Sequence, residues 1–154
     1  MSSPYPIHQA VLGRLYLAIG NFLTARPEAG QVFVGPLDVV LTMFDVVAPD
    51  LLVVASGQAD IMTDRHVRGA PALVVEILST STRRRDERVK RALYEREGVR
   101  EYWIVDTDRR LVAVHRRTAD GALCSVENAA AADGDAIATP LLPGFTLRAA
   151  DLFP

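Results

Sequence analysis

A continuous apolar segment, Leu73-Val74-Val75-Glu76-Ile77-Leu78, lies near the middle of the chain. A strand with one wet face alternates apolar and polar residues, so this segment predicts a central strand that is covered on both faces. The hydroxyl residues 79–82 can provide an N-cap for a helix over residues 83–97, which ends before Gly98. A second buried strand is predicted at residues 102–105. Strand, helix and strand at this spacing predict a βαβ unit with parallel strands.

The N-terminal third of the chain predicts one helix followed by short strands. Apolar residues recur at three- or four-residue spacing from Ile7 to Phe22, which is typical of an amphipathic helix that packs on a core, and Pro27 marks its end. After this helix we expect an antiparallel meander of three β-rich runs, at residues 32–34, 39–41 and 51–54.

The C-terminal third completes the predicted sheet. Residues 111–115 should pair back on residues 102–105 as a hairpin, and residues 142–147 should form a closing edge element. No internal repeat or linker is visible, and 154 residues fit one hydrophobic core. We therefore expect a single domain over residues 1–154 with an α/β fold, a mixed β-sheet flanked by helices. No Gly-rich phosphate loop follows any predicted strand, which argues against a dinucleotide or nucleoside triphosphate site of the usual kind.

Composition excludes several other classes of protein. The net charge of −2 gives no overall basic field, so contact with nucleic acid would need a local patch, for which residues 83–91 with their five Arg are the candidate. Cys124 is the sole cysteine, so neither an intrachain disulfide nor a cysteine-rich zinc site can form. No apolar run approaches the length of a membrane span and no signal-like segment is visible. We expect a cytoplasmic protein without membrane contact.

Two acids are the candidate metal ligands. Glu76 lies within the apolar strand, where a carboxylate must be neutralised, paired or bound to a metal because uncompensated burial is costly. Asp50 opens another apolar strand that would be a neighbour in a small sheet. A cation between two carboxylates relieves their repulsion, and Mg²⁺ favours such sparse oxygen sites. Taken singly, each acid has a plainer explanation: Asp50 as a solvated turn residue, and Glu76 as the partner of a buried Arg.

A series of motifs occurs in order along the chain: Pro49-Asp50-Leu51-Leu52-Val53-Val54, then Gly69-Ala70-Pro71-Ala72 leading through Glu76 to Ser79-Thr80-Ser81-Thr82, then Arg84-Arg85-Asp86, Lys90, Tyr94, Gly98-Val99, Glu101-Tyr102-Trp103-Ile104-Val105-Asp106 and Leu142-Pro143-Gly144-Phe145. Over about residues 8–154 the chain thereby resembles the Uma-two family of restriction-endonuclease-like proteins. That family is assigned to the PD-(D/E)XK nuclease superfamily. The resemblance implies a restriction-endonuclease-like core that cleaves DNA with a divalent metal, Mg²⁺ or Mn²⁺.

The same resemblance implies roles for individual residues. Asp50 and Glu76 would bind the metal, with the backbone carbonyl of Ile77 as a further ligand. The superfamily motif places a Lys two residues after the Glu, and this position is Leu78. Family members carry that Lys on the following helix, which implies that Lys90 is the third catalytic residue.

Lys90 is the only lysine in a chain with sixteen arginines, so a role that Arg cannot fill would explain its presence. A helical wheel places Lys90 on the border of the helix rather than on its buried face: Val89, Ala92 and Leu93 form the predicted inward stripe, and Asp86 and Tyr94 share the border with Lys90. The plainer alternative is an exposed lysine that pairs with Asp86.

Three further expectations concern activity and assembly. Members of the family generally carry an upstream Tyr-Glu pair ahead of the position of His8-Gln9, and its Glu is thought to join the metal site, so we expect this chain to be shortened at its N-terminus. A catalytically silent DNA-binding or protein-interaction module is therefore the alternative function, and hydrolysis of another phosphoester is a third. The positive mean hydropathy of +0.14 favours a homodimer that hides apolar surface. The three histidines show no zinc-like spacing and are assigned no ligand role.

Overall fold

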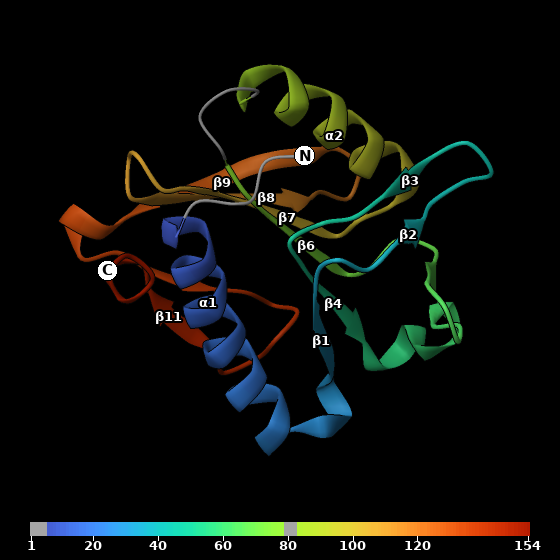
Figure 1. Ribbon diagram of the computed structural model, residues 1–154, viewed down its shortest axis with the longest axis horizontal. Coiled ribbons are helices and arrows are strands. Elements are labelled where there is room, and N and C mark those ends of the chain that lie inside the picture. The colour runs from blue at the N-terminus through green and yellow to red at the C-terminus, as the bar shows by residue number, and fades with distance from the viewer. Residues whose placement is uncertain (1–5, 79–82) are drawn as a thin grey trace.

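The computed structural model describes residues 6–78 and 83–154, with residues 83–86 described by their backbone only. The fold is a mixed α/β fold built on a six-stranded sheet in the order β1-β4-β6-β7-β8-β9, with α1 and α2 on opposite faces (Figure 1). The elements of this layer are α1 (Pro6–Ala25), β1 (Gly30–Val34), β4 (Leu51–Ala55), β6 (Leu73–Ile77), α2 (Arg83–Glu97), β7 (Glu101–Asp106), β8 (Leu111–Arg117) and β9 (Leu123–Ala130). No helix of the described residues has the length and apolar character needed to cross a membrane.

Two small sheets and several short helical turns complete the structure. One sheet has the order β3-β2-β5, and the other is a β10-β11 pair. Their strands are β2 (Val39–Val40), β3 (Val46–Val47), β5 (Val67–Arg68), β10 (Ala136–Ala138) and β11 (Thr146–Arg148). The 3-10 turns are η1 (Pro27–Ala29), η2 (Ser56–Ile61), η3 (Ala131–Asp133) and η4 (Ala149–Asp151).

The predicted βαβ unit is confirmed. Strands β6 and β7 are parallel, from the pair Leu73 and Glu101 to the pair Ile77 and Val105, and α2 connects them. Every residue of both strands is buried, as expected for a central strand pair covered on both faces. Helix α2 ends where Gly98 takes a positive φ of 96°. The predicted hairpin is also present, because β8 pairs antiparallel with β7. The predicted N-cap residues 79–82 lie outside the described residues.

The alternation of side chains along β6 and β7 separates two cores. Val75, Ile77, Trp103 and Val105 belong to the core that also contains buried residues of α1. Val74, Tyr102 and Ile104 point to the other face, where they pack with Tyr94 of α2 in a smaller core. Since successive strand side chains point to opposite faces, Glu76 falls on the α2 face.

The predicted meander is wrong, although its three strands exist. Strand β1 pairs directly with β4, and β2 lies in the second sheet between β3 and β5. Val39 of β2 is fully buried in a cluster with Leu52 and Val54 of β4, so the second sheet packs on one face of the first. Short apolar runs indicate strands but do not specify their partners, and this is why sequence adjacency was misleading.

The C-terminal region also differs from prediction. Strand β9 was not predicted; half of its residues are exposed, and its backbone bonds to β8 hold it at the edge of the sheet. The tail does not close the main sheet. Instead β11 pairs with β10, while Leu142, Phe145 and Leu147 pack into the core on the α1 side.

Candidate nuclease active site

Glu76 is the buried carboxylate at the centre of the site. Its residue is 7% exposed, and its Oε1 atom accepts a hydrogen bond of 3.0 Å from the Tyr94 hydroxyl. The same oxygen lies 3.2 Å from Nζ of Lys90. Burial raises the pKa of Glu76, and the nearby Asp50 raises it further, whereas Lys90 and the Tyr94 hydrogen bond lower it. The two α2 residues therefore compensate a carboxylate that the sheet has removed from water.

The buried side of α2 differs from the predicted one. Of the predicted inward stripe, Val89 is 63% exposed, Ala92 is exposed and Leu93 is partly buried. On the predicted border, Tyr94 is fully buried and Lys90 is partly buried. The side expected at the border thus faces the sheet, because the buried Glu76 carboxylate needs hydrogen-bond donors above it. Lys90 approaches Glu76, as its proposed role requires. Asp86 and Arg83 to Arg85, named as its ion-pair partner and as a phosphate-binding rim, have side chains outside the described residues.

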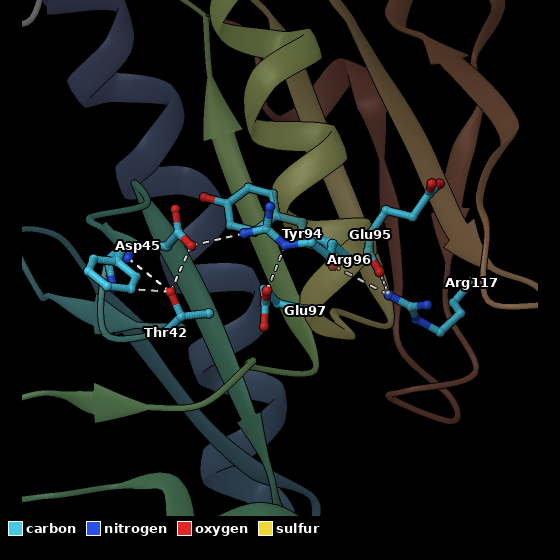
Figure 2. A network of polar contacts seen from close by, with 8 residues as sticks. Thr42, Asp45, Tyr94, Glu95, Arg96, Glu97 and Arg117 are labelled. Carbon is cyan, nitrogen blue, oxygen red and sulfur yellow. Dashed lines mark hydrogen bonds and ion pairs between the residues drawn. The ribbon is translucent and has the colours of Figure 1, made fainter.

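The C-terminal half of α2 is fixed on two sides (Figure 2). On one side, Arg96 lies 2.9 Å from the Asp45 carboxylate in the β2–β3 turn. On the other, Nη2 of Arg117 in β8 donates to the carbonyl oxygens of Glu95, at 2.7 Å, and Tyr94, at 3.3 Å. The partly buried Arg117 contacts are the stronger restraint, because an exposed ion pair such as that of Arg96 contributes little. These contacts fix the rotation of α2 that aims Tyr94 and Lys90 at Glu76.

Asp50 reaches the same end of β6 from the neighbouring strand. Strand β4 is antiparallel to β6 with Leu51 opposite Val75, so Asp50 stands one step beyond, at the level of Glu76. Its Oδ2 accepts the backbone N–H of Ile77 at 2.7 Å. Its Oδ1 lies 3.2 Å from Nε2 of His8. These two contacts hold the Asp50 carboxylate between the β6 backbone and the start of α1.

His8 is the residue that sequence reasoning missed. Zinc-type spacing was the wrong criterion, because His8 lies in the first turns of α1, far from Asp50 in sequence, and meets it only when α1 packs on the sheet. Its Nδ1 atom is buried without a hydrogen-bond partner among the described residues. The position of His8 in an amphipathic helix, next to the buried positions, predicts that its side chain is partly buried. It does not predict which residue His8 contacts.

The donor set at this end of β6 suits a hard divalent cation. Asp50 and Glu76 offer carboxylate oxygens, and the carbonyl of Ile77 points to the same side of β6 as the Ile77 N–H that bonds to Asp50. Oxygen ligands of this kind fit Mg²⁺ or Mn²⁺ rather than zinc. Across the described part of the chain, no group of three or more His, Cys, Asp or Glu side chains could hold a metal ion. The acid pair would therefore need the backbone carbonyl and water to complete a coordination shell.

A second buried carboxylate, Glu101, lies at the opposite end of β7. It is 1% exposed and accepts hydrogen bonds of 2.8 Å from Trp103 Nε1 and 2.7 Å from Thr139 Oγ1. Arg116 contributes an ion pair at 3.3 Å. Both Glu101 oxygens are thus engaged by three side chains, whereas Lys90 and Tyr94 share one oxygen of Glu76. Glu101 has the surroundings of a structural residue.

Comparison with known proteins shows the family to which the chain belongs. The family model of Uma2, described as "Putative restriction endonuclease", matches residues 1–150. The chain belongs to the Uma2 family. A similar solved structure is that of a putative nuclease belonging to DUF820 from Anabaena variabilis, with a TM-score of 0.75 and 18% sequence identity over 99% of this chain and 83% of the other. At that identity the likeness shows the fold alone. No curated protein matched the sequence.

The two buried glutamates of this Uma2 member predict opposite effects on stability. In metal-free buffer at neutral pH, Glu76→Gln should raise the free energy of unfolding by on the order of 1 kcal/mol, because the amide removes a buried charge while it can still accept from Tyr94. Glu101→Gln should lower it by roughly 3 kcal/mol, because an amide has one acceptor oxygen where Trp103 and Thr139 donate to two, and because it leaves Arg116 without its counterion. Urea unfolding measures both variants.

The pH dependence provides the control for this interpretation. A raised pKa means that the folded protein holds the Glu76 proton more tightly than the unfolded chain does. The destabilisation by Glu76 is therefore absent below its ordinary pKa and is complete above the raised one. The advantage of Glu76→Gln should shrink as the pH falls through this interval, and an advantage that is constant with pH would contradict the assignment.

Proposed function

We propose that this protein is a metal-dependent DNA endonuclease in which Asp50, Glu76 and Lys90 form the catalytic site. The proposal rests on one observation: these three side chains lie together at the carboxyl end of β6. Lys90 Nζ lies 3.2 Å from Oε1 of Glu76, and Oδ2 of Asp50 lies 2.7 Å from the backbone nitrogen of Ile77, the residue after Glu76. The Uma2 match and the nuclease-like fold support DNA as the substrate.

Asp50 and Glu76, with the carbonyl of Ile77, would hold Mg²⁺ or Mn²⁺, which when bound supplies a Lewis acid for the phosphate and a more acidic water. Tyr94 holds the Glu76 carboxylate in place through its hydroxyl, and burial together with Glu76 raises the pKa of Tyr94, so it remains a donor. His8 and the Ile77 N–H hold the Asp50 carboxylate in the same way. These three contacts hold both acids in position.

Lys90 adds the positive charge of the site. Its side chain is 37% exposed, so the ammonium reaches both Glu76 and the surface from which a phosphate would approach. There it can stabilise the negative charge that develops on the phosphate and orient a water molecule. A guanidinium would be larger and planar and could not place one compact charge at this point.

The alternative, a silent module of the same fold, draws support from one observation. Lys90 and Tyr94 both donate to Glu76, so this cluster could serve only to compensate a buried charge. The two functions predict different effects of substituting Lys90: a nuclease should lose cleavage activity, whereas a silent module should lose only stability.

Cleavage of supercoiled plasmid DNA with Mg²⁺ or Mn²⁺ is the direct test. Glu76→Ala should abolish cleavage, and Lys90→Met should reduce the rate by about a hundredfold or more, as expected when a charge that stabilises the transition state is lost. Lys90→Arg should be nearly inactive as well. Arg148→Lys, a similar exchange at a side chain that is 69% exposed, is the control and should retain full activity. A wild type without cleavage, combined with a Lys90→Met variant of lowered melting temperature, would support the silent module.

Metal binding is tested separately by calorimetric titration with Mn²⁺. Asp50→Asn should abolish binding, because the amide can still accept the Ile77 N–H but no longer provides a charged ligand. Asp151→Asn removes a surface carboxylate that is 57% exposed and should bind as the wild type does. Equal Mn²⁺ affinity in Asp50→Asn and the wild type would rule out this site.

We also propose a homodimer. The strongest surface signal is the turn between β2 and β3, which projects from the body of the molecule and exposes Met43 by 87% and Phe44 by 89% (Figure 1). Two adjacent apolar side chains that are this strongly exposed to water favour a contact with a second copy of the chain. Light scattering should give a dimer mass for the wild type and a monomer mass for Phe44→Ser, whereas Val126→Ser, at another exposed apolar side chain, should remain dimeric. A monomeric wild type at micromolar concentration would refute the dimer.

A further inference from the structure

A cavity of about 450 Å³ lies beneath α2, beside the proposed active site. Its floor is apolar and consists of Ile104, Leu111 and Ala113, with Leu78 next to them. Its charged and polar lining comes from α2, from the turn after β7 and from the sheet: Glu87, Arg88, Arg91, Asp106, Arg109, His115 and Asn128. Volumes of 300 to about 1,000 Å³ are usual for sites that bind small molecules.

The register of the sheet connects this cavity to Glu76. Glu76 pairs with Ile104, Ile104 with Ala113, and Ala113 with Asn128, so the four residues form one row across β6, β7, β8 and β9. Paired residues point to the same face of a sheet, and here this is the face covered by α2. Glu76 stands at one end of the row and the other three residues line the cavity. At strand spacings of about 4.8 Å, Asn128 lies roughly 14 Å from Glu76.

The charges of the lining favour an anion. Three guanidinium groups face two carboxylates, and one of these carboxylates, Asp106, accepts the backbone N–H of Arg109 at 2.9 Å and lies 3.8 Å from Nε of the same arginine. Arg91 donates to the carbonyl of Leu123 at 2.7 Å, which uses one of its five N–H groups. Arg88 and Arg109 lie at the exposed rim. Guanidinium groups in such a position are suited to hold a phosphate.

His115 is a buried polar residue of the cavity lining. The residue is 7% exposed, and its Nδ1 is buried without a hydrogen-bond partner among the described residues. Burial and the neighbouring Arg91 lower the pKa of His115, so its ring is neutral at neutral pH. The Asn128 amide offers both a donor and an acceptor, and a neutral imidazole whose N–H bonds to the Tyr102 backbone adds an acceptor; both kinds of group can pair with the edge of a nucleobase.

We propose that this cavity binds one nucleoside monophosphate unit, with its phosphate on Arg88 and Arg109, its base over the apolar floor, and the base edge hydrogen-bonded to His115 and Asn128. The row that joins the cavity to Glu76 assigns the unit to the nucleic-acid strand that the active site would cleave. This assignment rests on the proposed function. The binding chemistry itself does not, since a free nucleotide offers the same groups.

The test is a titration of the full-length, metal-free protein with thymidine 5′-monophosphate, followed by NMR signals of the His115 ring and by calorimetry. Arg88→Gln/Arg109→Gln should weaken binding by about tenfold or more, the effect of losing charged hydrogen bonds. Ala113→Phe should also weaken it, because the ring fills the cavity floor. Arg65→Gln/Arg148→Gln changes the net charge equally at exposed positions that do not line the cavity, and it should bind as the wild type does.

Two further ligands separate the parts of the proposal. Inorganic phosphate should bind more weakly than the nucleotide. A short single-stranded oligonucleotide should displace the bound nucleotide. Equal binding of phosphate, absence of saturation, or equal affinity in the Arg88→Gln/Arg109→Gln variant would overturn the nucleotide site. Binding of the mononucleotide without displacement by the oligonucleotide would overturn the assignment to a strand. Because these titrations need neither metal nor cleavage, failure of the nuclease proposal would leave them unchanged.

Discussion

The burial of the Glu76 carboxylate determines the arrangement of everything around it. A charged group in the middle of a covered strand is tolerated only if donors come to it, and in this protein they come from α2. This requirement sets which side of α2 faces the sheet, and so leaves Val89 in water while Tyr94 is buried. It also explains why α2 is tied through Arg117 to β8, because a small rotation of the helix would leave Glu76 without a partner.

The same interaction explains which predictions from sequence succeeded. The βαβ unit was predictable because two continuous apolar strands and a capped helix at close spacing allow one arrangement, and Glu76 stood out because it interrupts such a strand. The helical wheel failed because it ranks residues by hydrophobicity, and the decisive partner of α2 was a charge on another element. His8 could not be found for a similar reason, since its contact with Asp50 spans α1 and β4 and leaves no local pattern.

Strand pairing shows more clearly what the pattern of apolar residues cannot predict. The apolar runs of β1, β2 and β4 were recognised as strands. However, β2 belongs to another sheet, because Val39 packs with its side chain on the face of β4 and β2 does not pair with β4 through backbone hydrogen bonds. Strand β9 left almost no trace in the sequence, because an edge strand with one exposed face is held by its backbone bonds. The polar cavity depends on β9 for Asn128, so no reading of the sequence alone could have assembled it.

Helix α2 links the proposed active site and the proposed nucleotide site through its own geometry. Successive residues of an α-helix are about 100° apart, so Lys90 and Arg91 diverge by that angle: one reaches Glu76 on β6, and the other reaches the Leu123 carbonyl on β9 across the cavity. One rotation of the helix therefore sets both contacts. A change that turned α2 to improve the cavity would withdraw Lys90 from Glu76, and a change that brought Lys90 closer would shift Arg88 and Arg91. The cavity can be altered without turning the helix from the sheet side, through residues such as Ala113 and Asn128.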